Sequence, residues 1–269
     1  MTALRSPVVM IHGAFCGGWA FDGWRAVFER NGYATHTPDL RFHDGDTEPP
    51  HALGQTSMLD YASDLSELID RLGTAPILVG HSMGGLLAQM LAARHPVRAL
   101  VLLAPSAPWG VLPATPFEYA SANALYLAGD FWNKRLWPTH WIAAANALDN
   151  VPEDEQQAIL DRFVPESGLA TFEIMHWAFD LRRATQIDPR DVACPILCLA
   201  GQRDRINSPG TVKSIAARYR GRARYEELEG FSHWLVGEPG WESVAKLALE
   251  WLEDLSETDK TAIDMPTDD

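Results

Sequence analysis

The pentapeptide Gly80-His81-Ser82-Met83-Gly84 constrains the fold of this chain more than any other sequence feature. It joins a short apolar run at 76–79 to a leucine- and alanine-rich run at 85–93. A G-x-S-x-G between a strand and a helix is typical of a strained turn that lifts a serine hydroxyl above a sheet. The flanking glycines have no Cβ, so neighbouring backbones can pass closely. The pattern therefore predicts that Ser82 is a nucleophile at the end of a strand.

The rest of the chain alternates short apolar runs with helical patterns, which predicts an α/β fold with a mostly parallel central sheet flanked by helices. Strands are expected over 7–11, 33–38, 77–80, 99–103, 196–200 and 223–227. Helices are expected over 23–31, 61–73, 84–95, 210–219 and 240–255.

Between the fourth and fifth predicted strands the rhythm stops. Residues 107–190 contain prolines, short helical patterns and five tryptophans, which predicts a helical cap over the edge of the sheet where α/β proteins bind ligands. We therefore divide the chain into a first core part at 1–106, the cap at 107–190 and a second core part at 191–255. The acidic stretch 256–269 is expected to be a flexible tail.

The net charge of -14 argues against nucleic acid or anionic membrane as a partner, because the protein would repel either polyanion. No run of about 18 apolar residues predicts a membrane span, and the first ten residues lack a signal-peptide pattern. We expect a cytoplasmic protein without a cofactor or a metal. Its three cysteines are too few for a disulfide framework, and Cys16 is expected to be a loop or packing residue.

Two residues just beyond predicted strands complete a candidate triad. A serine hydroxyl needs a base to take its proton and a third group to orient that base. Asp204 follows the strand at 196–200 and His233 follows the strand at 223–227. Either residue alone is more often a turn or packing residue. Both, however, follow strands at the sheet edge where the strained turn at Ser82 is expected. We assign Ser82 as the nucleophile, His233 as general base and then acid, and Asp204 as the orienting carboxylate.

Acyl transfer also needs N–H donors for the developing oxyanion. The backbone N–H of Met83, directly after the nucleophile, is one candidate. The other comes from the loop after the first strand, with Ala14 as first choice and Phe15 as second. His12 is expected to hold that loop, and His81 to have a pocket or packing role.

An apolar substrate pocket is expected from the aromatic residues of the cap, although each tryptophan taken alone is more often a packing residue. The candidates are Phe15, Trp109, Trp132, Trp137, Trp141, His176, Trp177 and Trp234.

Two runs, VMIHGAFCGGW from Val9 to Trp19 and GHSMGG from Gly80 to Gly85, resemble the α/β-hydrolase superfamily. The resemblance is to the branch that holds plant methylesterases, salicylate-binding esterases and hydroxynitrile lyases, and it covers residues 7–106 and 191–255. It implies an α/β-hydrolase fold, the chain order Ser, Asp, His for the triad, and an oxyanion hole at Ala14 and Met83.

Differences within the superfamily narrow the expected chemistry. Lyases of this branch carry Thr after the first His and Lys directly after the catalytic His, where this chain has Gly13 and Trp234. Relatives that open epoxides use an aspartate in place of Ser82. The sequence therefore predicts a serine hydrolase for a small or medium carboxylic ester with an apolar or aromatic part. Hydrolysis of a lactone, a thioester or a C–C bond, cofactor-free peroxidatic chemistry, and a receptor with little turnover remain alternatives.

Overall fold

A computed structural model describes residues 5–45 and 48–263. In this part of the chain six parallel strands form a central sheet. Their spatial order is β2-β1-β3-β4-β7-β8. The strands are β1 (Val8–Ile11), β2 (Thr35–His36), β3 (Ile77–His81), β4 (Ala99–Leu103), β7 (Ile196–Gly201) and β8 (Ala223–Leu228). All six predicted strands are present, so the predicted α/β class with a parallel central sheet is confirmed.

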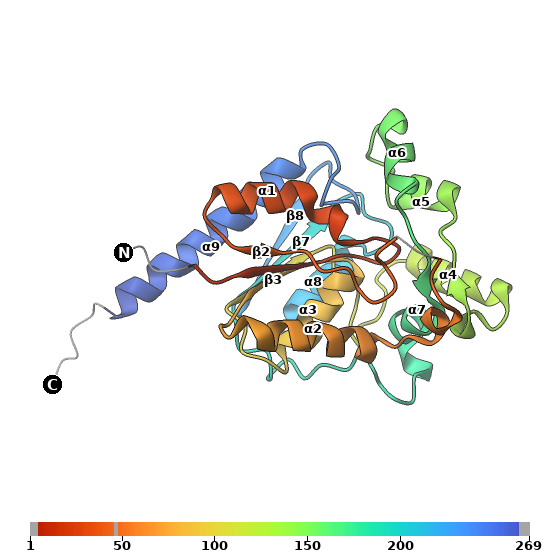
Figure 1. Cartoon of the computed structure of the whole chain (residues 1–269), viewed down its shortest axis with the longest axis horizontal. Coiled ribbons are helices and arrows are strands. Elements are labelled where there is room, and N and C mark those ends of the chain that lie inside the picture. The colour runs from red at the N-terminus through yellow and green to blue at the C-terminus, as the bar shows by residue number, and fades with distance from the viewer. Residues whose placement is uncertain (1–4, 46–47, 264–269) are drawn as a thin grey trace.

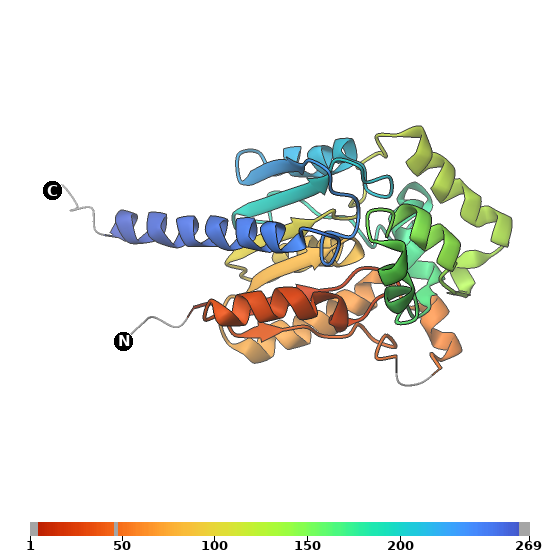
Figure 2. The same ribbon diagram turned by 90° about the horizontal axis from the view of Figure 1, so that it is seen from above.

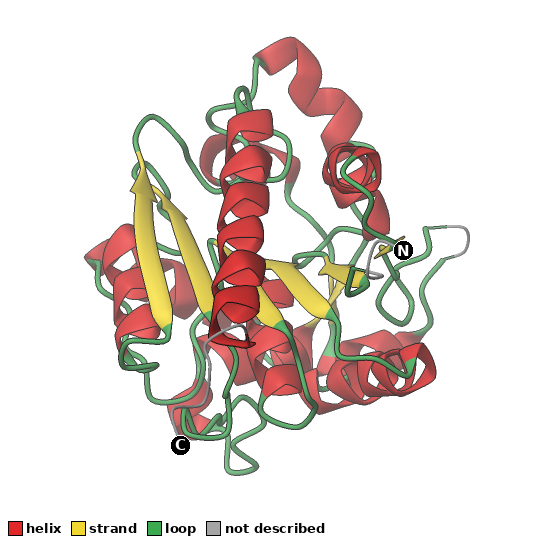
Figure 3. Ribbon diagram, turned by 90° about the vertical axis from the view of Figure 1, so that its left-hand side faces the viewer, coloured by secondary structure: helices red, strands yellow, loops and turns green. Residues whose placement is uncertain are grey.

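Helices cover both faces of this sheet (Figure 1). They are α1 (Asp22–Arg30), α2 (Met58–Leu72), α3 (Met83–Ala92), α8 (Pro209–Ala217) and α9 (Trp241–Ile263), with short 3-10 helices η1 (Gly18–Phe21) and η2 (His51–Gln55). One face packs against α2, α3 and α8, and the other against α1 and α9. Figure 2 shows α1 and α9 from above, and Figure 3 shows helices on both sides of the strands.

The two cores follow from the alternation of side chains along each strand. In β1, Val9 and Ile11 pack toward α2 and α3, whereas Val8 and Met10 pack toward α1 and α9. All four are buried. A strand covered on both faces needs apolar residues at every position, which explains the continuous apolar runs in the sequence.

Two helices are longer than their apolar patterns predict. The helix expected from residue 61 begins at Met58, because Ser57 and Asp60 form a capping box at its N-terminus, and it ends at Gly73, whose φ is 66°. Helix α9 continues beyond residue 255 to Ile263, so the first part of the predicted tail is helical, and residues 264–269 lie outside the described residues. With 23 residues α9 has the length of a membrane span, but no helix in the described part combines such length with enough apolar residues.

The segment predicted as a cap folds into short helices and a two-stranded antiparallel sheet, which the sequence pattern did not predict. Its elements are α4 (Pro116–Ala124), η3 (Leu125–Ala128), η4 (Phe131–Asn133), β5 (Arg135–Leu136), α5 (His140–Asn146), α6 (Glu153–Leu160), β6 (Glu166–Ser167), α7 (Gly168–Met175) and η5 (Trp177–Phe179). In Figure 1, α4 to α7 lie at one end of the sheet, opposite both termini.

Candidate active site

Ser82 occupies a strained turn between β3 and α3. Its φ is 53° and its ψ is -119°, a backbone conformation that costs a residue with a Cβ on the order of 1–3 kcal/mol. A Cβ on Gly80 would lie 2.3 Å from the carbonyl oxygen of Gly84, and one on Gly84 would lie 2.0 Å from that of Ile11. The two glycines therefore permit the close backbone contacts that hold the serine at the end of β3.

The side chains of Ser82, His233 and Asp204 form one hydrogen-bonded chain. His233 Nε2 lies 3.2 Å from Ser82 Oγ, and His233 Nδ1 lies 2.8 Å from Asp204 Oδ2. The other carboxylate oxygen of Asp204 accepts the backbone N–H groups of Ile206 at 2.7 Å and Asn207 at 3.0 Å. These bonds fix the carboxylate, so Nδ1 carries the proton and Nε2 faces the serine as an acceptor.

The site is almost enclosed. Ser82 is 8% exposed, and His233 and Asp204 are each 4% exposed. Electrostatic interactions between these groups are stronger than in water, since little solvent screens them.

The loop after β1 lies directly against the nucleophile. A Cβ on Gly13 would lie 3.1 Å from Ser82 Cβ, so the backbone of 13–14 borders the site, with Ala14 half-buried beside it. Met83 is the first residue of α3, and the side chain of Ser82, at the N-cap position, makes no capping hydrogen bond. The first N–H groups of a helix have no partner within it. Among the described residues no side chain caps this end of α3, where the backbone N–H of Met83 is the expected oxyanion donor.

His12 holds this loop from beneath. Its Nε2 accepts the backbone N–H of Leu40 at 3.0 Å, so Nδ1 carries the proton and donates to the Gly13 carbonyl at 2.8 Å. Burial, together with the nearby His43, lowers the pKa of His12 to about 3, which keeps the imidazole neutral. This arrangement agrees with the structural role expected for His12.

His81 contacts the backbone of the candidate base. Its Nε2 donates to the His233 carbonyl at 2.9 Å, and the two ring centroids are 4.9 Å apart. Burial, with a further contribution from His233, lowers the pKa of His81 to about 3. His81 is therefore a neutral neighbour that does not repel a protonated His233.

Buried carboxylates of the cap attach it to the core. Glu118 in α4 accepts the backbone N–H of Ser208 at 3.0 Å, where α8 begins. Glu173 in α7 accepts the backbone N–H of Met58 at 2.7 Å, where α2 begins. Both carboxylates accept backbone N–H groups at the N-termini of α8 and α2, where such groups have no partner within the helix.

A third carboxylate, Glu166, forms a buried pair with His43 at 3.1 Å and accepts from Tyr61 at 2.7 Å. Burial alone would lower the pKa of His43, but the charge and hydrogen bond of Glu166 outweigh it and raise that pKa above 6.5. Burial alone would raise the pKa of Glu166, but His43 and the hydrogen bonds hold that pKa below 4.5. The pair is thus ionised, although the sequence shows no partner pattern for His43.

The aromatic residues predicted to line one pocket pack in three separate groups. Trp234 packs on His81, Trp19 and Phe163, beside the site. Trp109 and Trp177 pack on each other. A third group, within the cap, contains Trp132 and His176 with Tyr126, Phe131 and Phe172.

The other residues predicted to line the pocket differ in their exposure and hydrogen bonding. Trp141 is 73% exposed, and Trp137 is 60% exposed. His176 donates from Nε2 to the Ala122 carbonyl at 3.1 Å, so this nitrogen is already paired within the cap. Phe15 lies in the loop after β1, where it is half-buried and has a φ of 64°.

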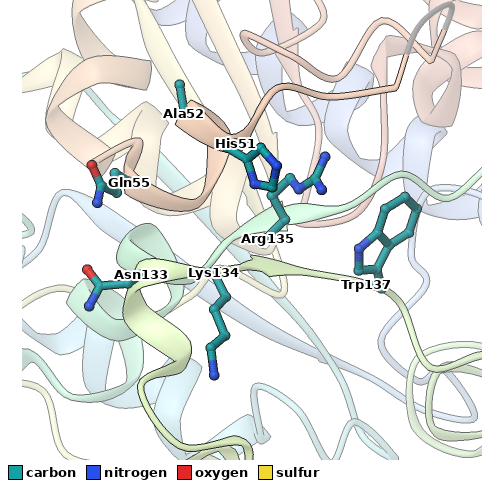
Figure 4. A pocket seen from close by; sticks show the side chains of 7 residues that line it. All are labelled: His51, Ala52, Gln55, Asn133, Lys134, Arg135 and Trp137. Atoms are coloured by element: carbon teal, nitrogen blue, oxygen red, sulfur yellow. The ribbon is translucent and has the colours of Figure 1, made fainter.

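A cavity of about 480 Å³ lies between η2 and the η4–β5 segment (Figure 4). Its lining residues are His51, Ala52, Gln55, Asn133, Lys134, Arg135 and Trp137. None of the three triad residues lines this cavity. Trp137 therefore borders a cavity that no triad residue lines.

An α/β fold with a serine at a strained strand-to-helix turn and a hydrogen-bonded imidazole defines a class of proteins with a nucleophile elbow. The chain belongs to the alpha/beta hydrolase family, whose sequence model matches residues 8–246. The family suggested by the sequence is therefore confirmed.

Similar proteins include a pyrethroid hydrolase of Sphingobium wenxiniae, 34% identical over 101 residues, 36% of this chain and 34% of that protein. Epoxide hydrolase 3 of Xenopus tropicalis is 27% identical over 253 residues, 86% of this chain and 67% of that protein. Among solved structures, a methylesterase from Arabidopsis covers 93% of this chain and 99% of its own, with a TM-score of 0.71 and 16% identity.

Proposed function

We propose that this protein is a carboxylic-ester hydrolase that works through an acyl-enzyme on Ser82. The observation that carries the proposal is the hydrogen-bonded chain from Ser82 Oγ to His233 Nε2, at 3.2 Å, and from His233 Nδ1 to Asp204, at 2.8 Å. Nucleophile, base and orienting acid are thus already within proton-transfer reach of one another.

The reaction divides into two halves. As Ser82 Oγ attacks the ester carbonyl, His233 Nε2 takes its proton, and the backbone N–H groups of Met83 and Ala14 stabilise the oxyanion. The imidazolium then donates that proton to the leaving alkoxide, which departs as an alcohol. A water molecule gives its proton to His233 and attacks the acyl carbonyl, which releases the acid and restores the serine.

The substrate that we propose is a small or medium ester with an apolar or aromatic part. The nearly enclosed triad and the Trp234 side chain, which packs on His81 next to Ser82, support this choice. The similarity to proteins named as a pyrethroid hydrolase and a methylesterase agrees with ester chemistry. Lactones, thioesters and activated C–C bonds remain alternatives for the same residues.

Epoxide opening is disfavoured despite the similarity to epoxide hydrolase 3. A carboxylate that opens an epoxide forms an ester, which water then cleaves. A serine hydroxyl such as that of Ser82 would instead form an ether, which the same residues do not hydrolyse. The residue at the elbow therefore favours acyl transfer.

The test compares turnover of p-nitrophenyl acetate and butyrate by the wild type, Ser82→Ala and the control Ser214→Ala. Ser214 is an exposed serine of α8 whose hydroxyl, within the described part of the chain, donates only to the Gly210 carbonyl of its own helix. Loss of the nucleophile is expected to lower kcat by on the order of a million-fold, whereas the control keeps wild-type activity. A Ser82→Ala enzyme with most of its activity would end the proposal.

A receptor with little turnover is the alternative from another class. Stoichiometric labelling of the wild type, but not of Ser82→Ala, by a fluorophosphonate would support the enzyme. Tight binding of apolar esters without labelling or turnover would support the receptor.

A further inference from the structure

Asn150 lies in the cap, between α5 and α6, on a segment that inserts into the core. Its neighbours Leu148 and Val151 are 0% and 4% exposed and belong to the core that packs against α1 and α9. The backbone of Asn150 is therefore anchored on both sides by apolar burial. Its side chain is presented to the core at a fixed place.

The side-chain amide of Asn150 makes three hydrogen bonds, all to the core. Its Nδ2 donates to the carboxylate of Glu238 at 2.6 Å and to the Gly230 carbonyl at 3.1 Å. Its Oδ1 accepts from the guanidinium of Arg203 at 2.9 Å. Both amide hydrogens and the amide oxygen are thus in use, which fixes the orientation of the group.

Two of these partners belong to the loop that carries the proposed base. Gly230 lies three positions before His233. The carboxylate of Glu238 accepts the backbone N–H of Ser232, with both oxygens at 3.0 Å. The hydroxyl of Ser232 also donates to Asp149, the residue before Asn150. The residue that precedes the imidazole is thus held through both its N–H and its hydroxyl.

The third partner belongs to the loop that carries the proposed acid. Arg203 immediately precedes Asp204, and its backbone N–H donates to the Phe231 carbonyl at 2.8 Å. The loops of Asp204 and His233 therefore meet each other, and the amide of Asn150 joins them from above. Glu238 is 0% exposed, and burial raises its pKa, so its carboxylate depends on donors such as Asn150 and Ser232 to stay charged.

We propose that Asn150 is a positioning residue of the cap that sets the relative placement of His233 and Asp204 through the loops that carry them. This inference rests on the proposed ester hydrolysis. In the hydrogen bonds of the described residues Asn150 touches none of the three triad side chains, and it acts through Gly230, Glu238 and Arg203 in the loops that carry them. The cap then contributes to the chemical step, in addition to covering the site.

The expected effect falls on kcat. A displacement of about 1 Å within a catalytic group can cost about a hundredfold in rate. Loss of the Asn150 amide should therefore lower kcat by about tenfold to a hundredfold while KM changes less than about twofold. A contribution to stability alone would lower the melting temperature and leave kcat and KM unchanged in the folded enzyme.

The test uses the full chain with Asn150→Ala, with Asn150→Leu, which keeps most of the side-chain volume, and with the control Asn146→Ala. Asn146, the last residue of α5, is half-buried, and among the described residues its Nδ2 donates only to the Ile142 carbonyl of its own helix. Initial rates with p-nitrophenyl butyrate give kcat and KM well below each melting temperature, and fluorophosphonate labelling gives the reactivity of Ser82 directly.

A fall in kcat and in labelling rate for both Asn150 variants, with wild-type values for Asn146→Ala, supports the proposal. Folded Asn150 variants that keep the wild-type kcat and labelling rate overturn it, whatever their melting temperatures. The comparison with Ser82→Ala separates this failure from a failure of the proposed function. An inactive Ser82→Ala beside fully active Asn150 variants rejects only the positioning role, whereas an active Ser82→Ala rejects the ester hydrolase itself.

Discussion

The Nε2 of His81 donates to the backbone carbonyl of His233 at 2.9 Å, so the residue before the proposed nucleophile, Ser82, holds the residue proposed as its base. This contact ties the end of β3 to the loop after β8. The second nitrogen of His81, Nδ1, is buried and has no hydrogen-bond partner among the described residues. The single bond from Nε2 is therefore the polar contact of this ring.

We predict that His81→Phe lowers kcat about fivefold and that His81→Gln, which keeps an N–H donor, loses less. A neutral hydrogen bond contributes about 1 kcal/mol, and about 1.4 kcal/mol corresponds to a tenfold change in rate. Ester turnover and thermal unfolding of both variants provide the measurement. Equal kcat values for wild type and His81→Phe would contradict the prediction.

Gly84→Ala is expected to prevent folding or to lower the free energy of unfolding by more than about 3 kcal/mol, because overpacking against rigid backbone is severely destabilising. The added Cβ would lie 2.0 Å from the Ile11 carbonyl oxygen and 2.5 Å from that of His12. The matched control is Gly73→Ala, which has open space around its Cβ and a φ of 66°. Gly73→Ala should cost about 1 kcal/mol from backbone strain alone. Urea unfolding of the soluble variants distinguishes the two, and a stable Gly84→Ala would show that the elbow can widen.

The buried pair of His43 and Glu166 predicts a pH-dependent stability. The raised pKa of His43 means that its contribution is present below pH 6.5 and is lost as pH rises through the folded-state pKa. The lowered pKa of Glu166 means that its contribution is present above pH 4.5 and is lost as pH falls through the folded-state pKa. The pair should therefore stabilise the fold most between pH 4.5 and 6.5.

Glu166→Gln measures this contribution. Removal of one partner of a buried pair costs about 3–5 kcal/mol, so the variant should lose that much stability within this pH window and less outside it. The exposed pair of Glu67 and Arg71 supplies the control, Glu67→Gln, with a much smaller effect. Urea unfolding at a series of pH values gives both profiles. A deficit for Glu166→Gln that does not vary with pH would argue against an ionised pair.

The three cysteines should resist thiol reagents in the native protein. Burial raises the pKa of Cys198 to about 12 and that of Cys194 to about 11, and it also raises the pKa of Cys16. Thiolate is the reactive form, so little of it exists at neutral pH. Labelling with Ellman's reagent should be slow in buffer and should reach three thiols per chain in denaturant. Rapid labelling of native Cys16 would show that the loop after β1 opens.

The sheet, and the meeting of Ser82, Asp204 and His233 at one of its edges, could be predicted because their signals are local. A strand buried on both faces is a continuous apolar run, as in β3 and β4, and a residue just beyond a parallel strand must lie at the same sheet edge as its neighbours. Ser82, Asp204 and His233 all obey this rule. The family model matches residues 8–246, a range that contains all six strands of the central sheet.

The cap could not be predicted to the same degree, because its contacts join residues far apart in the sequence. Aromatic content alone does not say which way a side chain points, and the exposed Trp141 and the packed Trp132 look alike in sequence. No local pattern links Glu166 to His43 or Asn150 to Glu238. Their separations, 123 and 88 residues, place these pairs beyond any periodicity.

Glu118 and Glu173 supply acceptors to the first turns of α8 and α2, two helices of the other half of the molecule. A chimera with a foreign cap that lacks these glutamates would leave the backbone N–H groups of Ser208 and Met58 without acceptors. Each buried group left unpaired should lower the free energy of unfolding by about 1–3 kcal/mol. A cap exchanged by recombination should therefore carry a glutamate at both of these positions. The cap and the α/β core of this hydrolase should therefore be exchangeable only when the residues that join them are matched.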